Sequence, residues 1–437
     1  MNAVARESVA GLSWRLWRDP AAWATASDVL VILIAVSLPW STTLVSIFAA
    51  ALLVSMAPFL DFKAFLQSLK RLICAFPIAL FALAAVGMLW SEAPWATRLH
   101  AVGPTAKLLM LPVLFYHFER SARGVQVFIA FLVSCVLLLA MSWIVAFDPR
   151  LALKPEASYG VPVKNYIDQS QEFALCAVAL AFPIVTLVRT KRIMQAVLLS
   201  TIALGFVVNM VFIVVSRTAL VTMPIMLAVF ALLHLKWRST LVILCTAIVF
   251  AGLAWAASPH LRSTTATFLT DYTIYKERNQ PTSIGNRLEY WQKSLRFLAE
   301  APIIGHGTGS TRGLFEQAAT GPEALVGGQI VSNPHNQTLN VAVQWGLTGI
   351  VVLYAMWLVH LLLFRGDGLA AWIGLLVVVQ NIFTSLFNSH ISDFHEGWMY
   401  VLGVGIAGGM LLRQARAKEH WDRAVPLNHD GWHARAR

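Results

Sequence analysis

Long apolar runs, separated by short polar connections, set the pattern of this chain. Runs of about 17–25 apolar residues are long enough to cross a bilayer as helices. We find about twelve runs of the length that crosses a membrane, centred near residues 33, 50, 81, 109, 136, 179, 204, 225, 248, 349, 377 and 404. The pattern predicts an all-α polytopic membrane protein with four parts: transmembrane helices in 1–257, a loop domain in 258–335, further transmembrane helices in 336–412 and a tail in 413–437.

The polar segment 258–335 is much longer than any other connection. It contains an amphipathic stretch from Ser283 to Ala299, whose apolar residues share one helical face: Ile284, Leu288, Trp291, Leu295 and Leu298. This period predicts a helix that lies along the membrane surface, with Ser283 as its N-cap. The GHGTG stretch at 305–309 has no strand pattern before it and no Lys-Ser/Thr after it, which favours a flexible turn over a phosphate loop.

Composition agrees with the membrane class. Hydrophobic residues make up 58% of the 437 residues and charged residues 13%, whereas soluble domains are nearer half apolar and a quarter charged. A net charge of +11 would suggest nucleic acid for a soluble protein, but basic cytoplasmic connections explain it here. We therefore expect membrane lipids as partners and no nucleic acid. The four cysteines all lie in apolar runs, which favours buried thiols over disulfides or metal ligands.

The basic residues also predict the orientation. The amino-terminal segment is basic, and so is every second short connection and the carboxy-terminal tail. Because such segments are retained in the cytoplasm, we expect both termini there. The opposite face then receives the segments 91–104, 147–169, 258–335 and 387–396.

His335 is the first candidate for chemistry. It follows Asn333-Pro334, which disfavours helix, so the next helix should begin at or just after His335. The positive end of that helix would lower the pKa of the imidazole and favour its neutral, proton-accepting form. The alternative is a histidine at the membrane surface that only caps the helix.

Two arginines are candidates for binding an anion. Arg287 lies in the GNRLEYW motif at 285–291, and its guanidinium could hold a diphosphate by paired hydrogen bonds. The alternative is an arginine that extends to lipid headgroups from a surface helix. Arg217, in the SRTAL stretch at 216–220, lies in a tight outside turn, where a lone cation favours a phosphate partner over a helix-end anchor.

Polar residues at three other places could line a substrate groove. These are Lys164, Gln169 and Gln171 around the start of the sixth apolar run, Trp291 in the amphipathic stretch and Asn336 beside His335. The alternative for Lys164, Gln169 and Gln171 is a helix end that faces water without binding substrate. Asp393, in the last outside turn, could orient His335 or a sugar hydroxyl. His390, His395 and Glu396 could suggest a metal, but the two histidines are not four residues apart on one helical face, so we expect no metal site.

These motifs together resemble the O-antigen ligase and O-antigen polymerase superfamily of bacterial inner membranes. The features in common are SRT at 216–218, GNRLEYW at 285–291 and His335-Asn336 with Gly346 and Gly349 downstream. The order of apolar runs, with one dominant loop before the tenth, is similar to the family across the whole chain. The resemblance implies a GT-C-like fold, related to other lipid-donor glycosyltransferases, and no metal or other cofactor.

Carried over to this sequence, the resemblance implies a role for each candidate. Arg217 and Arg287 would bind the diphosphate of an undecaprenyl-diphosphate-linked glycan. His335 would take the proton from an acceptor sugar hydroxyl of lipid A–core at the periplasmic face, with Asp393 as a supporting acid. Fixed guanidiniums can stabilise the charge on the leaving diphosphate, and in-line attack would invert the sugar's configuration.

Other functions remain open at this point. A polymerase, or a protein O-oligosaccharyltransferase, would use the same lipid-linked donor with a different acceptor. A lipid or polysaccharide transporter is the alternative of another class. Transporters typically place charges at mid-membrane and repeat their halves, and neither feature is evident in this sequence.

Overall fold

The computed structural model describes residues 19–154, 159–278, 282–320 and 330–424, and these residues form helices and connections without any strand. The helices before the long polar segment are α2 (Pro20–Ser37), α3 (Thr42–Met56), α4 (Phe62–Leu69), α5 (Leu72–Val86), α6 (Trp95–Ala106), α7 (Met110–Phe118), α8 (Gly124–Phe147), α9 (Tyr166–Ala179), α10 (Ala181–Arg189), α11 (Ile193–Phe212), α12 (Arg217–His234) and α13 (Trp237–Ala257). Those that follow are α14 (Pro259–Arg278), α15 (Ser283–Glu300), α16 (Thr311–Thr320), α17 (Gln337–Leu363), α18 (Leu369–Thr384) and α19 (Phe394–Ala424).

Helices occupy the position of every apolar run. Within the described residues, nine helices are long and apolar enough to cross a membrane, or ten if the pair α4 and α5, bent by 79°, counts as one span. Three of the nine are composite, because α3 continues into a 3-10 turn at Ala57–Phe59, α6 into α7 and α9 into α10. The apolar α18 is shorter, with 16 residues, and α19 begins apolar but ends in a polar stretch. The chain is thus an all-α, multi-pass membrane protein.

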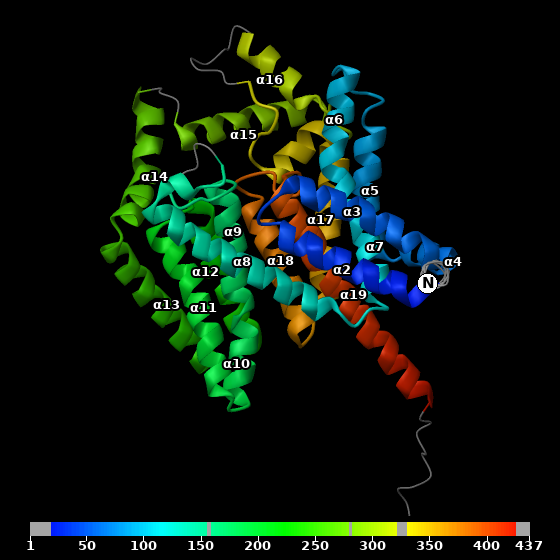
Figure 1. The fold of residues 1–437 in the computed structure, drawn as a ribbon. Coiled ribbons are helices and arrows are strands. Elements are labelled where there is room, and N and C mark those ends of the chain that lie inside the picture. The colour runs from blue at the N-terminus through cyan, green and yellow to red at the C-terminus, as the bar shows by residue number, and fades with distance from the viewer. Residues whose placement is uncertain (1–18, 155–158, 279–281, 321–329, 425–437) are drawn as a thin grey trace, which may run out of the picture.

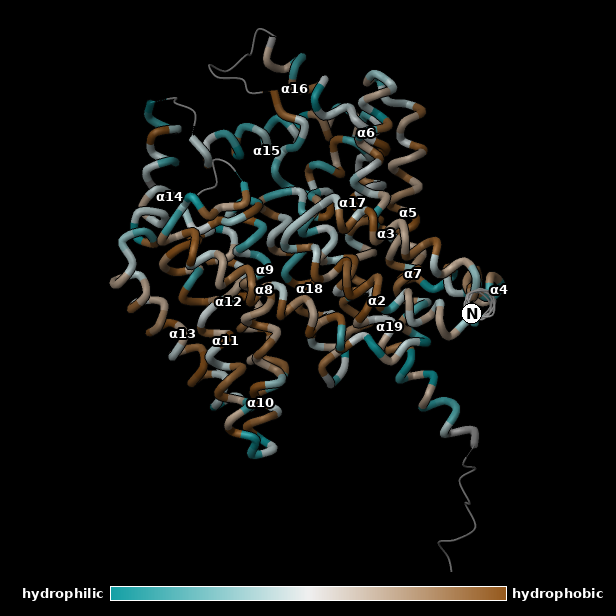
Figure 2. Tube along the Cα trace, viewed as in Figure 1, coloured by the Kyte–Doolittle hydropathy of each residue, from teal (hydrophilic) through white to brown (hydrophobic). Residues whose placement is uncertain are grey.

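The polar parts gather at the ends of the helices. Figure 2 shows hydrophobic residues along α8 to α13 and α17 to α19, and hydrophilic residues in α15, α16 and the last turns of α19. In Figure 1, α15 lies across one end of the other helices, and the end of α19 points away from that region. The fold therefore separates two polar regions by an apolar layer.

Close packing of α17, α18 and α19 positions the loops that carry the candidate residues. α19 packs on α7 and α18, and α17 packs on α5 and α15. The α19 helix approaches its neighbours closely because it carries small residues where they meet, as is typical of helices in membranes. A side chain at any of these positions would collide with α7 or α18: Gly403, Gly405, Gly408 and Gly409.

The amphipathic helix α15 was predicted correctly apart from its first residue. Its N-cap is Thr282, which has an extended backbone and whose hydroxyl accepts a hydrogen bond from Gly285 N (3.1 Å), so the prediction of Ser283 was wrong. The face packed on the protein is not the apolar face defined above. It carries Glu289, Tyr290 and Phe297, whereas Leu295 on the apolar face is 55% exposed. Leu295 is therefore available to lipid, whereas Trp291 on the same face packs against the cluster around Tyr290.

The segment 258–335 contains more helix than the single one predicted. α14 precedes α15 and α16 follows it. A start signal for α14 was present in the sequence, since Ser258 caps it by accepting a hydrogen bond from Leu261 N (3.1 Å) and Pro259 is its first residue. The clue was missed because α14 has no clear apolar face.

α17 is interrupted at Gly346, and the loop that contains GHGTG supplies hydrogen-bond partners for the backbone groups that lose theirs. Gly346 has φ +61° and ψ −154°, which interrupts two helical hydrogen bonds. The carbonyls of Val343 and Gln344 accept instead from the loop amides of His306 (2.9 Å) and Gly307 (2.8 Å). On the other side of the break, the amides of Leu347 and Thr348 donate to loop carbonyls of residues 302 and 303. This loop is a turn, as predicted, but its amides bind backbone rather than phosphate, and it is held on both sides rather than flexible.

Candidate active site

His335 sits in a strained turn just before α17. Its backbone is left-handed, with φ +53°, and its amide donates to Asn333 Oδ1 (2.9 Å). The helix then begins at Gln337, with Asn336 as N-cap accepting from Leu339 N (3.1 Å), which confirms the predicted start. A non-glycine residue in this conformation costs free energy and is often found at functional sites.

A chain of hydrogen bonds joins His335 to Asp393. Nδ1 of His335 lies 2.9 Å from Asn388 Oδ1, and Asn388 Nδ2 donates to Asp393 Oδ2 at 2.6 Å. Because the carboxylate accepts from the amide NH2 group, the amide oxygen must face the imidazole, and Nδ1 must carry the proton. Nε2 is then the proton-accepting nitrogen, and it makes no hydrogen bond to the described residues. We call His335, Asn388 and Asp393 the base relay.

The environment keeps the imidazole neutral. Burial lowers the pKa of His335, and the nearby Arg287 lowers it further, whereas the hydrogen bond with Asn388 raises it. The predicted direction is confirmed, but burial and a guanidinium are the causes, in place of the helix end. Burial raises the pKa of Asp393 to about 6, with Lys107 opposing that rise. Asp393 is thus mainly ionised at neutral pH, as the relay requires.

The helix α15 places Arg287 next to the imidazole. Tyr290 lies one turn after Arg287 and stacks on His335, with ring centroids 6.1 Å apart and planes at 30°. Arg287 is partly buried and forms no ion pair with an acid among the described residues. Burial, and then the neighbouring Arg217, lower the pKa of this guanidinium, which still remains charged at neutral pH. An unpaired, partly desolvated guanidinium is a ready ligand for an anion.

Arg217 and Arg287 line one cavity of about 500 Å³ between α12, α14 and α15. Arg217 is the first residue of α12, where the SRT stretch ends an extended segment. Its guanidinium pairs with Asp271 Oδ2 (3.2 Å) and donates to Thr267 Oγ1 (2.5 Å), both on α14. The anion that Arg217 contacts in this structure is therefore a protein carboxylate, which holds the guanidinium at the cavity wall.

The candidate groove residues do not lie together. Lys164 pairs with Glu172 (3.5 Å) and donates to the Leu38 carbonyl, and it lines a second pocket. Gln169 is buried and donates to Ser142 Oγ (2.9 Å). The structure thus brings the arginines and His335 together and leaves this part of the predicted groove elsewhere.

The other groove candidates serve mainly internal contacts. Gln171 is fully buried and accepts from Gln380 Nε2 (3.0 Å), while its own Nε2 has no partner among the described residues. Trp291 packs on the cluster around Tyr290, and its buried Nε1 has no partner there either. Asn336 is occupied as the N-cap of α17.

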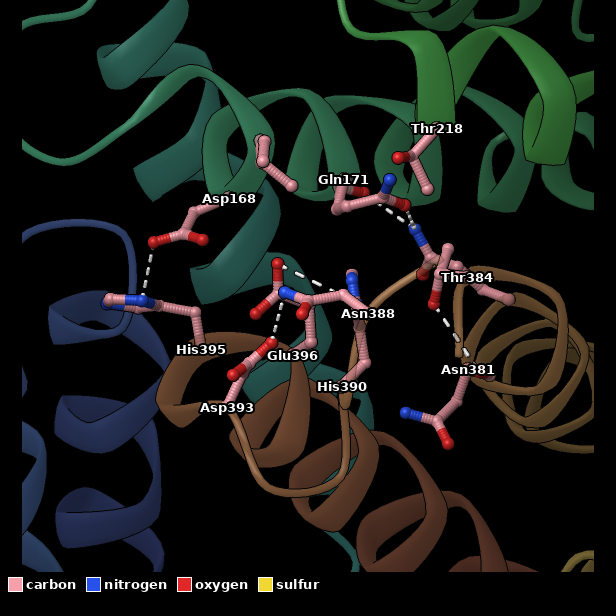
Figure 3. Close-up of polar contacts among 12 residues, drawn as sticks. Asp168, Gln171, Thr218, Asn381, Thr384, Asn388, His390, Asp393, His395 and Glu396 are labelled. Carbon is pink, nitrogen blue, oxygen red and sulfur yellow. Dashed lines mark hydrogen bonds and ion pairs between the residues drawn. The ribbon is translucent and has the colours of Figure 1, made fainter. Parts of the chain in front are cut away.

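A second polar cluster lies behind the relay, where the start of α19 meets α9. Figure 3 shows Asp168 facing His395, whose Nδ1 lies 2.6 Å from Asp168 Oδ2. His390 is fully buried 3.7 Å from Glu396, and burial lowers the pKa of His390 to about 4. Among the described residues, no three His, Cys, Asp or Glu side chains form a group that could hold a metal ion.

Three residues of the site were not predicted from the sequence: Asn388, Tyr290 and Asp271. Asn388 lies five residues before Asp393 in the predicted outside turn, so the polar character of that turn was the only signal. Tyr290 stands in the same motif as Arg287, three residues on, and this spacing places the two side chains near each other on a helix. Asp271 had no signal, because α14 was not predicted.

The arrangement provides the parts for proton abstraction beside an anion. A neutral imidazole with a free Nε2 can take a proton, and two guanidiniums nearby can stabilise negative charge on a departing group. Comparison with curated proteins gives no match. Residues 202–354 match the protein-family model described as O-antigen ligase. This segment runs from α11 into α17 and contains Arg217, Arg287 and His335, so this part of the chain is similar to O-antigen ligases.

Proposed function

We propose that this protein is an O-antigen ligase, a glycosyltransferase that moves a glycan from undecaprenyl diphosphate to a sugar hydroxyl of lipid A–core. One observation carries the proposal. The guanidinium of Arg287, which has no acid partner in the part of the chain that the structure describes, lines the same cavity as Arg217 and is near enough to lower the pKa of His335, on which Tyr290 stacks. An anion-binding group and a proton acceptor thus stand side by side, as transfer from a lipid diphosphate requires.

The transfer step follows from these groups. The acceptor hydroxyl gives its proton to Nε2 of His335 while its oxygen forms a bond to the anomeric carbon of the donor. The bond from that carbon to the diphosphate oxygen breaks, and the electron pair leaves with undecaprenyl diphosphate. Arg287 and Arg217 stabilise the added negative charge, each such contact being worth on the order of 3 kcal/mol when water is excluded.

The geometry also supports inversion at the sugar. His335 belongs to the loop before α17, whereas the guanidiniums face the cavity bounded by α12 and α14. With one base for the acceptor hydroxyl and guanidiniums for the diphosphate, we expect direct attack opposite to the leaving group. We propose a single displacement with inversion that needs no metal, because the two guanidiniums supply the positive charge.

The membrane arrangement is part of the proposal. Twelve spans, a GT-C-like architecture, cytoplasmic termini and a periplasmic site in the bacterial inner membrane fit the positive-inside pattern of the sequence. The unpartnered apolar residues of α15, such as Leu295, are then in contact with the outer leaflet. Both substrates are amphiphiles and reach the site along that leaflet.

Reconstitution tests the proposed function. Purified protein is mixed in detergent with lipid-linked glycan and lipid A–core, and the linkage of the product is determined. We expect transfer by the native protein and none by His335→Ala, which should still bind the donor better than Arg217→Ala does. Normal transfer by His335→Ala would remove the imidazole from the mechanism. Activity of pure protein without an ion gradient also distinguishes an enzyme from a transporter.

The acceptor separates a ligase from its relatives. A polymerase or a protein O-oligosaccharyltransferase would use the same donor cavity and base. Deletion of the gene distinguishes them, because loss of capped lipopolysaccharide with polymer still on the lipid carrier supports the ligase. Loss of the polymer itself would overturn it in favour of a polymerase.

A further inference from the structure

The two guanidiniums of the cavity between α12, α14 and α15 have different partners. Arg287 has no acid partner in the part of the chain that the structure describes, whereas Arg217 is paired with the carboxylate of Asp271 on α14. Nothing in the transfer step described above uses Asp271. A protein carboxylate thus occupies one of the two groups that would bind the donor diphosphate.

The helix α14 engages Arg217 at both terminal nitrogens of its guanidinium. Nη1 lies 3.2 Å from Asp271 Oδ2, and Nη2 donates to Thr267 Oγ1 at 2.5 Å. The side chains of Arg217 and Asp271 are only 26% and 20% exposed, so water screens their charges incompletely. A phosphate group takes two N–H groups of a guanidinium side by side. A diphosphate on Arg217 would therefore lie next to the Asp271 carboxylate and be repelled by it.

Asp271 is joined to α15 through its backbone and not through its carboxylate. Its carbonyl accepts a hydrogen bond from Thr282 Oγ1 (2.9 Å), and Thr282 is the N-cap of α15, the helix that carries Arg287. This bond stays in place when the carboxylate turns away from Arg217. Rotation of one short side chain is thus sufficient to free the guanidinium.

The charge of the leaving group gives such a carboxylate a use. When the bond from the diphosphate to the sugar breaks, the diphosphate gains negative charge. Guanidiniums that stabilise this charge during transfer also hold the product more tightly than the donor, which slows its release. A carboxylate that returns to Arg217 competes with the product and favours its departure.

We propose that Asp271 and the lipid diphosphate exchange on Arg217. The carboxylate occupies the guanidinium in the empty enzyme, gives way to the donor, and returns as undecaprenyl diphosphate leaves. Arg287, which has no such competitor, makes the first contact with the incoming donor. The inference rests on the proposed function, since it concerns the donor site of the same transfer.

The test uses Asp271→Asn, which keeps the shape of the side chain and an acceptor for Arg217 but removes the charge. Initial rates of glycan transfer are measured with the purified full-length protein in non-ionic detergent. We expect KM for the lipid-linked donor and the inhibition constant of undecaprenyl diphosphate each to fall by about fivefold, the upper range for a partly exposed ion pair. If Asp271 only positions Arg217, both constants will rise or stay unchanged, and the proposal is overturned.

A matched control is available on α16, outside the cavity. Glu316 pairs with Arg312 at 2.8 Å and does not line the cavity, so Glu316→Gln removes one negative charge without touching Arg217. Both constants should equal those of the native protein. A fall as large as that of Asp271→Asn would show that net charge alone sets the affinity, and would overturn the exchange.

A double variant tests whether Asp271 acts through Arg217. Equilibrium binding of undecaprenyl diphosphate is measured with Arg217→Ala and with Arg217→Ala/Asp271→Asn. The gain in affinity from Asp271→Asn should largely be lost in this background. An undiminished gain would show that Asp271 repels the diphosphate without Arg217, which contradicts the exchange. If the native protein neither binds the lipid-linked donor nor transfers its glycan, the proposed function fails, a result distinct from these.

Discussion

Asn388 should make the activity depend on Asp393, although the carboxylate does not touch the imidazole. In Asp393→Asn, the new amide can either accept from or donate to Asn388, so Asn388 can turn and present its NH2 group to His335. The imidazole would then carry its proton on Nε2 and could not act as the base. Asn388→Ala removes the link altogether and leaves the tautomer of His335 undetermined.

The expected loss of kcat in these two variants follows from the two hydrogen bonds of the relay. A bond between neutral groups, such as that of His335 with Asn388 at 2.9 Å, contributes about 1 kcal/mol. The shorter bond of Asn388 to the carboxylate, at 2.6 Å, contributes about 1.5–3 kcal/mol. With a factor of ten in rate for about 1.4 kcal/mol, we expect kcat to fall by about 10- to 100-fold in either variant. KM for the donor should stay unchanged, because Arg287 is untouched.

The double variant Asn388→Ala/Asp393→Asn provides the decisive measurement. If Asp393 acts only through Asn388, the double variant should be no slower than Asn388→Ala alone in initial rates of glycan transfer. If the two single variants reduce the rate by factors that multiply in the double variant, the relay is refuted. Asp393 would then act on the substrate or on His335 without Asn388. Thermal melting of each variant in detergent checks that the comparison is made on folded protein.

Three further predictions concern the pH dependence, the anion site and the fold. The kcat of the native protein should fall below pH 6, because Asp393, whose pKa is raised to about 6, and His335 both take up protons there. The decline of kcat on the acid side should be less steep in Asp393→Asn. An unchanged decline would contradict the relay. Arg287→Lys keeps the charge but loses the fork, so transfer should drop by about 10- to 100-fold, whereas Arg296→Ala on the exposed face of α15 should transfer normally. Gly346→Ala would place its Cβ 2.5 Å from the backbone of Ile303, so its melting temperature in detergent should fall by several degrees, and an unchanged value would show that the break can relax.

The span pattern could be predicted because apolar length alone determines it. Each apolar run of the sequence lies in a helix of the structure, and the start of α17 followed from Asn333-Pro334. The helices of the segment 258–335 were predicted only in part. α15 has a strong apolar period, whereas α14 has only the start signal of Ser258 and Pro259 in the sequence and is also stabilised by packing on α15, which no sequence pattern shows.

Site residues could be predicted where a single charged or titratable residue stands alone in its segment. They could not be predicted where several polar residues stand together. A lone arginine in a tight turn or a histidine after Asn-Pro stands out, so Arg217 and His335 could be singled out. Asn388 is one of several polar residues in its turn, and only the fold shows that it joins His335 to Asp393. Gln169 is the reverse case: the sequence made it a candidate for either a substrate groove or a water-facing helix end, but in the structure it is buried and binds Ser142.

The loop that repairs the break in α17 also limits how substrates can arrive. Pulling this loop away would strand four backbone groups in apolar surroundings, each costing about 1–3 kcal/mol, besides breaking the bond from Thr308 Oγ1 to the Ala84 carbonyl (2.6 Å). Hydrogen exchange at the amides of His306, Gly307, Leu347 and Thr348 should accordingly be as slow as in the buried helices. In the proposed function, a loop held this firmly does not serve as a gate for the lipid-linked donor, and we expect the donor to enter past α12 and α14, whose residues line the cavity of Arg217 and Arg287.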